Sequence, residues 1–530
     1  MKKLGQLTFA LSLVSLGCGD DSSTAETSAD TQAVTGSEPR PSPMEALLEA
    51  IGGQGSLDGI RGVRLEGSGK RYLLNSGTRP EDEPIEANSF ERSVSIDFSG
   101  TSLRVDTSRQ IVYLFPGSQT YSETIQGNYG VSTQPLFGRP LGALGSDRVA
   151  SIRSQELLLT PHLLLRTLPP AAFAAGPDVT IDGAPQHTLV ASVGPRPLTL
   201  FVDASSGFIT KLETGTLGYL ERDMSLEVFF SDWAPAGDTS FPRNARVLVG
   251  GREVFSQQLS DVSVNPAFEA GMFELPEGVT PLYDEALYAR GQLSQQWFAM
   301  FDSVGTPSSG VDVLVTRVDV APNVAKLVGT THHSFVVRQE AGLILADAAL
   351  YEERGGALLD YLEAEYPGVP VTHVVASHFH EDHAAGIREV LGRTQAKLVV
   401  QESVAEFWRK LLTAPSTLRP DALAESPRNV DVITVPDAGE ITLEDASNPV
   451  TIYHLNTLHA ADMLLTRDVA SNSVFVVDIY NPGNVAQPDS AALDEAITSH
   501  QIPTADLKLV GAHSAGIDDY AALKASLMPQ

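Results

Sequence analysis

The chain has 530 residues, of which 42% are hydrophobic and 19% are charged, so it can bury a large core and exceeds the length of one ordinary domain. Its 36 basic and 66 acidic residues give a net charge of -30, which repels polyanions and argues against nucleic acid as a partner. The single cysteine, Cys18, excludes a disulfide framework and a cysteine-based metal cluster within the chain. A metal site here must therefore use histidine and carboxylate ligands.

The first residues predict export from the cytoplasm. Lys2 and Lys3 precede an apolar run that is too short to span a bilayer stably, which is typical of a signal peptide over residues 1–17. The run ends in Ser-Leu-Gly-Cys and resembles a bacterial lipoprotein signal, in which Cys18 would become the lipidated first residue. Ser15 stands where such signals usually carry an aliphatic residue, so an ordinary cleaved signal peptide remains the alternative.

Residues 18–43 are dominated by small polar residues and proline, which predicts a disordered tether between a membrane surface and the folded part. Together with the signal, this tether favours a lipoprotein of the bacterial periplasm or cell envelope, held to the membrane by a lipid on Cys18.

Residues 44–282 predict a β-rich N-terminal domain. Alternating apolar and polar residues at 63–67, 93–98 and 225–230 favour a twisted antiparallel sheet. Helices are expected at residues 44–51 and 156–168, the second interrupted by Pro161. The density of strands and the lipoprotein context resemble the open half-barrels of bacterial lipoprotein-carrier proteins, while a structural or substrate-docking module fits the same pattern.

The remainder predicts a connecting helix and a second domain. Apolar residues between 287 and 300 are spaced as on one face of a helix, which predicts a helix over residues 283–306. Beyond it, strands expected at 311–315, 335–338 and 343–347 alternate with helices expected at 352–365 and 384–391. This alternation predicts a layered domain of the α/β or α+β class over residues 307–530.

Histidines are concentrated in this second domain. Ten of the 12 lie after residue 330, and three fall within His-Phe-His-Glu-Asp-His at residues 378–383, directly after a strand expected at 371–377. In an extended loop His378 and His380 project to the same side and can reach one metal ion. Asp382 and His383 point differently as the chain turns into a helix, which suits a second ion. The alternative, a polar surface turn, gives so dense a cluster little structural purpose.

This motif matches the His-x-His-x-Asp-His signature, so residues 311–520 resemble the metallo-β-lactamase superfamily. The resemblance implies an αββα sandwich that carries further ligands at the ends of apolar strands. Those ligands are His459 after residues 450–455, Asp478 after residues 474–477, and His513 at the end of residues 509–513. Leu458 and Ala512 replace the glycines that commonly precede the last two histidines, which leaves the fit to a substrate open.

The resemblance also implies how the ligands divide. His378, His380 and His459 would hold one ion, Asp382, His383 and His513 the other, and Asp478 would bridge them. Zinc is the implied metal, although histidine and carboxylate ligands also accept iron or manganese.

The implied reaction is attack of a bridging hydroxide on the carbonyl of an ester, thioester, lactone or β-lactam, with Asp382 or a metal-bound water handling the proton. Residues 307–530 hold 14 basic and 30 acidic residues, and 14 minus 30 is a net of -16, so we expect a small acyl substrate and no nucleic acid. Two other functions stay open: an iron-binding oxidoreductase of the same fold, and a non-catalytic protein that binds lipid or lipoprotein.

A few residues outside the ligand set receive weaker predictions. Asp347 is expected to support the histidine loop from behind, and Tyr480 to donate a hydrogen bond to substrate. His332 and His333 either line the mouth of the pocket or make hydrogen bonds in the opening hairpin. Structural roles are expected for the other histidines, which are His162, His187, His373, His454 and His500.

Overall fold

The computed structural model describes residues 41–98, 102–113, 116–133, 142–293, 314–329, 331–483, 487–514 and 516–528. The described residues from Ser42 onward belong to one unit of the chain. The expected signal peptide, Cys18, most of the tether and residues 294–306 of the expected connecting helix lie outside the described residues. Within the described part of the chain, every helix is too short or too polar to cross a bilayer.

The unit from Ser42 onward begins with a capped helix. Helix α1 spans Pro43–Ala50, and proline at its first position has the backbone angle that a helix start requires. The side chain of Ser42 accepts from the backbone N–H of Glu45 at 3.3 Å, and the Glu45 carboxylate accepts from the backbone N–H of Ser42 at 2.7 Å. This reciprocal cap explains why the helix starts within the last residues of the expected tether.

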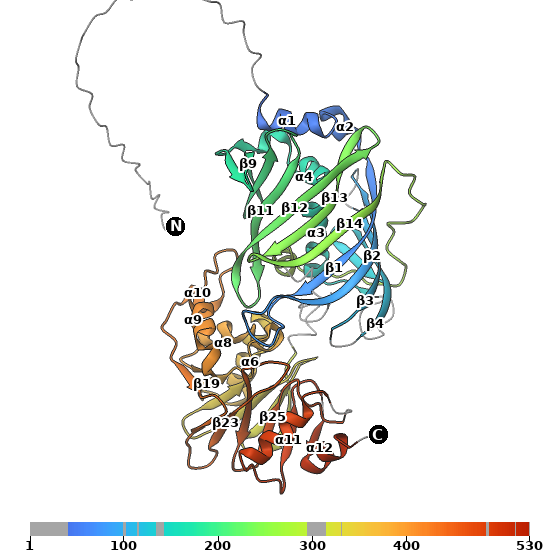
Figure 1. Cartoon of the computed structure of the whole chain (residues 1–530). Coiled ribbons are helices and arrows are strands. Elements are labelled where there is room, and N and C mark those ends of the chain that lie inside the picture. Colours follow the sequence, from blue (N-terminus) through green and yellow to red (C-terminus); the bar gives the residue numbers. More distant parts are fainter. Residues whose placement is uncertain are drawn as a thin grey trace, which may run out of the picture. The chain divides into compact units, whose positions relative to one another are not determined.

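The N-terminal region is a 14-stranded antiparallel sheet, which confirms the prediction of a β-rich domain (Figure 1). Strands β1 and β14 pair in the middle of the strand order, and the order ends in β6 on one side and β7 on the other. The strands are β1 Gly62–Leu73, β2 Ile85–Asp97, β3 Ser102–Ile111, β4 Gly117–Gln126, β5 Tyr129–Ser132, β6 Gly142–Ala143, β7 Ala174–Ala175, β8 Val179–Ile181, β9 Ala184–Val193, β10 Arg196–Asp203, β11 Ile209–Gly218, β12 Arg222–Ala236, β13 Thr239–Val249 and β14 Arg252–Val264.

Two helices fill the concave face around which this sheet curls (Figure 1). Helix α3, Ser146–Leu159, has 12 buried residues, and α4, Pro161–Thr167, follows it after a break at Thr160. Buried ion pairs tie α3 to the sheet: Arg92 to Glu156 and Arg148 to Glu123, both at 2.8 Å. The two short helices α2, Gln54–Gly59, and α5, Glu285–Gly291, complete the region. The resemblance to lipoprotein carriers stays a prediction.

The C-terminal region is an αββα sandwich, as predicted. Its first sheet runs in the order β15 to β21, with parallel pairing from β18 onward, and its second runs from β22 to β27. The strands are β15 Thr316–Ala321, β16 Val324–Val328, β17 Ser334–Arg338, β18 Leu343–Ala346, β19 Val371–Val375, β20 Lys397–Gln401, β21 Val432–Val435, β22 Glu440–Leu443, β23 Val450–Leu455, β24 Met463–Asp468, β25 Ser473–Val476, β26 Lys508–Gly511 and β27 Ile517–Asp519.

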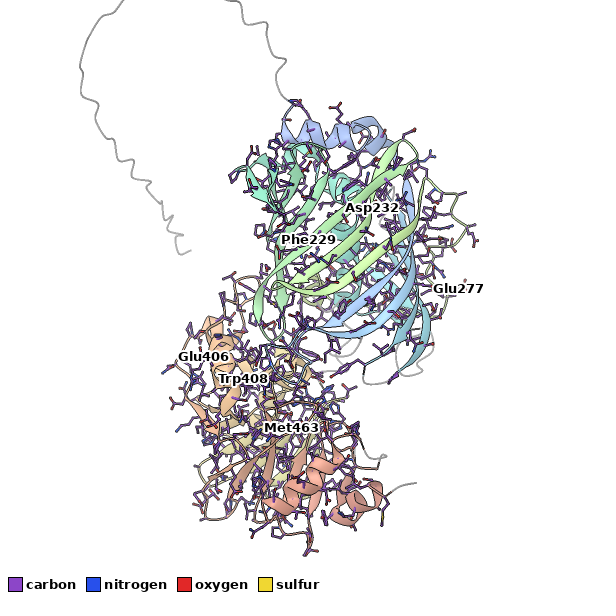
Figure 2. The ribbon with its side chains drawn as sticks, viewed as in Figure 1. Phe229, Asp232, Glu277, Glu406, Trp408 and Met463 are labelled. Atoms are coloured by element: carbon purple, nitrogen blue, oxygen red, sulfur yellow. The ribbon has the colours of Figure 1, made fainter. Side chains whose placement is uncertain are left out.

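Apolar side chains of both sheets meet in one core, in which Phe335 of β17 stacks on Phe475 of β25 with ring centroids 5.6 Å apart. Helices cover each outer face, as in Figure 1. Trp408 of α9 and Met463 of β24, both labelled in Figure 2, are buried, at 1% and 0% exposure. The helices are α6 Glu352–Glu365, α7 Glu381–Ala384, α8 Ile387–Arg393, α9 Ala405–Thr413, α10 Ala422–Glu425, α11 Ser490–Ser499 and α12 Tyr520–Ser526.

Three predicted elements differ from the observed ones. The structure describes only residues 314 and 315 of the strand expected at 311–315. The prediction is wrong for these two residues, because they lie outside any strand and β15 begins at Thr316. Helix α3 begins ten residues before the predicted start at 156. The helix predicted at 384–391 is divided into α7 and α8 at Gly386, because its backbone N–H donates to the carbonyl of Ala348 at 2.8 Å, and the carbonyl of Asp382, its partner in a continuous helix, accepts from Leu350.

Candidate metal centre

The histidine loop leaves the end of β19 and is held by a buried aspartate. Both oxygens of Asp347 accept hydrogen bonds from Ser377, one from its backbone N–H at 2.8 Å and one from its hydroxyl at 2.9 Å. Asp347 itself has a φ of 60°, a backbone conformation that aspartate tolerates better than most residues. The predicted support of the histidine loop by Asp347 is therefore present.

One group of potential ligands consists of His378, His380, His459 and Asp478, whose ligand atoms all lie within 4.8 Å of one another. The Nε2 atoms of His378 and His459 lie 3.3 and 3.0 Å from Asp478 Oδ2. Both nitrogens are buried and have no hydrogen-bond partner among the described residues. Buried imidazole nitrogens without a hydrogen-bond partner, facing a carboxylate, fit a bound cation.

The second group consists of His332, Asp382, His383 and His513, within the same limit of 4.8 Å. The Nε2 atoms of His383 and His513 are 3.1 Å apart. Asp478 also reaches this group, because its Oδ1 lies 2.6 Å from His513 Nε2 and its Oδ2 lies 3.1 Å from His383 Nε2. The Asp478 carboxylate thus faces both groups. This is the position that the family resemblance implied for a bridging ligand.

Outer contacts orient the rings by binding the nitrogen that faces away from the centre. His383 Nδ1 lies 3.1 Å from Asp347 Oδ2, and His513 Nδ1 lies 3.0 Å from the carbonyl of Thr331. Because carboxylate and carbonyl oxygens only accept, each Nδ1 carries a hydrogen, and each Nε2 is the nitrogen that points into the centre and would bind a metal ion there.

The electrostatics of the centre keep the Asp478 carboxylate ionised. Burial by itself would raise the pKa of Asp478, but the neighbouring charges of His383, His513 and His459 outweigh it and hold that pKa well below its ordinary value. Burial lowers the pKa of His378 to about 4, so this imidazole is neutral at neutral pH and free to act as a ligand.

The structure settles the placement of the residues that the sequence left open. His332 belongs to the second group, with its Nε2 3.0 Å from Asp382 Oδ2. His333 makes hydrogen bonds in the opening hairpin, the second of the two predicted roles. Its backbone N–H donates to the carbonyl of Ala512, and its Nδ1 accepts from the backbone N–H of Gly329 at 3.2 Å. The predicted role of Tyr480 toward substrate is wrong, because its hydroxyl donates to Asp518 at 2.6 Å.

The remaining histidines make hydrogen bonds with residues outside both ligand groups, as expected for structural roles. These pairs are His162 with Thr239, His187 with Asp178, His373 with Thr372, His454 with Ala461, and His500 with Glu440.

Asp462 supports the centre and was missed as a functional residue. It is 2% exposed, and burial raises the pKa of its carboxyl to about 8, against the opposing effects of its own backbone, the backbone of Phe379 in the histidine loop and the charge of His459. Its position three residues after His459 is the signal that could have been used.

Comparison with known proteins gives one family match. The model described as the metallo-beta-lactamase superfamily matches residues 327–496, which include six of the seven predicted ligands and end before His513. A search of curated proteins found no match.

The solved structures similar to part of the chain include metallo-beta-lactamases. The enzyme from Pontibacter korlensis is 20% identical, with a TM-score of 0.30 over 40% of this chain and 97% of that chain. The DIM-1 metallo-beta-lactamase is 16% identical, with a TM-score of 0.30 over 40% of this chain and 94% of that one. The enzyme from Hirschia baltica is 14% identical, with a TM-score of 0.29 over 40% of this chain and 95% of that one. The family match identifies the C-terminal domain, over residues 327–496, as a member of the metallo-beta-lactamase superfamily.

Proposed function

We propose that this protein is a hydrolase that uses two divalent metal ions, zinc in the first place, to cleave a small carbonyl compound. The observation that carries the proposal is the position of Asp478, whose carboxylate faces three imidazoles through Oδ2 and a fourth through Oδ1. A carboxylate that contacts two adjoining ligand groups is suited to hold two ions a few ångströms apart.

Each group supplies enough side chains for one ion without any cysteine, which suits zinc and also tolerates iron or manganese. Two such ions would polarise a carbonyl oxygen and activate water for attack on its carbon. Asp382 is the residue that we assign to proton transfer, because its side chain is 47% exposed and so accessible from solvent. His332 orients the Asp382 carboxylate by donating to Oδ2 from Nε2.

Charge favours a carbonyl substrate over a phosphodiester. Two-metal sites attack either carbon or phosphorus, so the ligands alone do not decide between them. Residues 307–530 carry 14 basic and 30 acidic residues, 14 minus 30 or a net of -16, whereas enzymes that act on nucleic acid gain much of their affinity from lysine and arginine near phosphates. An ester, thioester, lactone or β-lactam requires no such field.

The test combines metal analysis with a substrate panel. We expect about two zinc ions per chain in zinc-loaded protein, and hydrolysis of chromogenic esters, lactones or cephalosporins in preference to RNA, single-stranded DNA and bis-nitrophenyl phosphate. Asp478→Ala should lose both metal and turnover, while Asp494→Asn, whose side chain pairs with Lys524 on the surface, should lose neither.

Three outcomes would contradict the proposal. A folded sample that retains no metal after zinc addition would remove the metal site. Iron with redox activity and no hydrolysis would favour the oxidoreductase, and preference for the phosphodiesters would overturn the argument from charge.

The location of the protein is part of the same proposal. An extracytoplasmic position, with the chain tethered by a lipid on Cys18, is supported by the apolar run after Lys2 and Lys3 and by the polar segment that follows the cysteine.

A further inference from the structure

A loop of the N-terminal sheet lies against the metal centre. Residues 74–84 connect β1 to β2, and within them the carbonyl oxygen of Gly77 lies 2.7 Å from Nε2 of His380. These two residues are 303 positions apart in the chain. The ring of His380 is 3% exposed, so the contact is made in a buried place where a lost hydrogen bond is costly.

The same loop also contacts the segment that carries His459. The carbonyl of Thr78 accepts from the backbone N–H of Ala461 at 2.8 Å, and the hydroxyl of Thr78 donates to the carbonyl of Leu458 at 3.0 Å. Two adjacent loop residues therefore contact both segments that supply histidines to the first ligand group.

The chemistry of the Gly77 contact decides which nitrogen of His380 is free. A backbone carbonyl can only accept a hydrogen bond, so Nε2 of His380 carries the hydrogen. The neutral ring then has its lone pair on Nδ1, which leaves that atom available to a metal. Hydrogen bonds of this kind, from the outer nitrogen of a ligating histidine, orient the ring and raise its basicity as a ligand.

The loop is built to keep the carbonyl in place. Its turn is closed by Asp82, which accepts from the backbone N–H of Arg79 at 2.8 Å, and a Cβ atom on Gly77 would lie 2.7 Å from the Cβ of Asp82. The phenol of Tyr113, two residues after the end of β3, donates to the carbonyl of Ser76 at 3.2 Å. Burial, followed by the charges of Asp382 and Asp478, raises the pKa of Tyr113 and keeps this donor protonated.

We propose that the loop of residues 74–84 is a positioning element of the metal centre: the N-terminal domain fixes His380 through Gly77, and the His459 segment through Thr78. The inference rests on the proposed function, because it requires that the first ligand group binds a metal ion. It gives the N-terminal domain a direct part in the activity, beyond that of a structural or docking module.

The experiment uses the full chain and cobalt as the probe. Gly77→Val forces the turn away from Asp82 and displaces the carbonyl, and Gly117→Val is the matched control, since a Cβ at Gly117 meets nothing within 4 Å. We expect the affinity for one ion, measured by competition with a chelator, to fall about 10- to 100-fold in Gly77→Val and to stay unchanged in the control. The visible absorption spectrum of the cobalt-loaded protein, which reports coordination, should change in Gly77→Val only.

A second variant keeps the test decisive if Gly77→Val does not fold. Leu73 and Ile85 are partners in the β1–β2 register, so Asn-Gly in place of residues 74–84 closes the hairpin and removes both contacts. The same loss of affinity and change of spectrum are expected. If wild-type protein binds two ions and the folded variants bind cobalt with unchanged affinity and spectrum, this inference is wrong while the proposed function stands. If wild-type protein binds no metal, both are wrong.

Discussion

The contact between Asp347 and the histidine loop allows a quantitative prediction. Asp347 is fully buried, and its Oδ2 receives two hydrogen bonds, from the hydroxyl of Ser377 at 2.9 Å and from Nδ1 of His383 at 3.1 Å. In Asp347→Asn one oxygen can still accept from the backbone of Ser377, and asparagine tolerates the φ of 60°. The amide nitrogen then replaces Oδ2 and offers a donor where an acceptor is required.

The size of the effect follows from what His383 loses. A hydrogen bond to a charged group contributes about 1.5–3 kcal/mol, and without it Nδ1 of His383 has no buried acceptor. The ring can recover only by moving its hydrogen to Nε2, the atom that faces His513 and the Asp478 carboxylate. We therefore expect a loss of about 10- to 100-fold in affinity for the second ion, or about 1.4–2.7 kcal/mol.

The assay is chelator competition on wild-type and variant protein, with unfolding of the metal-free forms measured in parallel. Asp468→Asn is the matched control, because Asp468 is equally buried and also accepts from a nearby serine, Ser471, through its backbone and hydroxyl, yet has no contact with the centre. Both variants should lose fold stability, and Asp347→Asn alone should lose metal. Equal metal affinity in wild type and Asp347→Asn would refute the orienting role.

Three further predictions concern stability, turnover and location. Burial lowers the pKa of His162 to about 3 and its Nδ1 has no hydrogen-bond partner, so the unfolded chain takes up a proton below about pH 6.5 while the folded chain does not. Stability should accordingly fall as the pH drops from 6.5 toward 3, by about 2 kcal/mol at pH 5, and urea unfolding of His162→Gln should lack this loss. Asp382→Ala should abolish turnover and leave the circular dichroism spectrum nearly unchanged; equal activity would remove Asp382 from the mechanism. Cys18→Ser should release the protein from membranes, and an unmodified N-terminus elsewhere in the mass spectrum would favour the ordinary signal peptide.

The local pattern of apolar and polar residues was sufficient to predict many strands and helices of the C-terminal domain. Strand β23 and helix α6 have the bounds that their sequences predict, because an apolar run and a helical repeat each mark one buried surface. The start of α3 was missed for the opposite reason. Its first half is polar, and those residues are buried only because partners such as Glu123 on β4 lie opposite, which a helical repeat of apolar residues does not reveal.

The amino-acid sequence by itself predicted the side chains of the candidate metal centre. Imidazoles and carboxylates crowded into residues 378–383 have few structural uses, and later candidates follow apolar strands that end at one edge of a sandwich. Only the tertiary structure decided how those ligands are oriented. The hydrogen bond from His380 to Gly77 joins residues 303 positions apart, and a carbonyl is present at every residue, so no side chain in the sequence marks it. Folding alone brings the β1–β2 loop to the candidate metal centre.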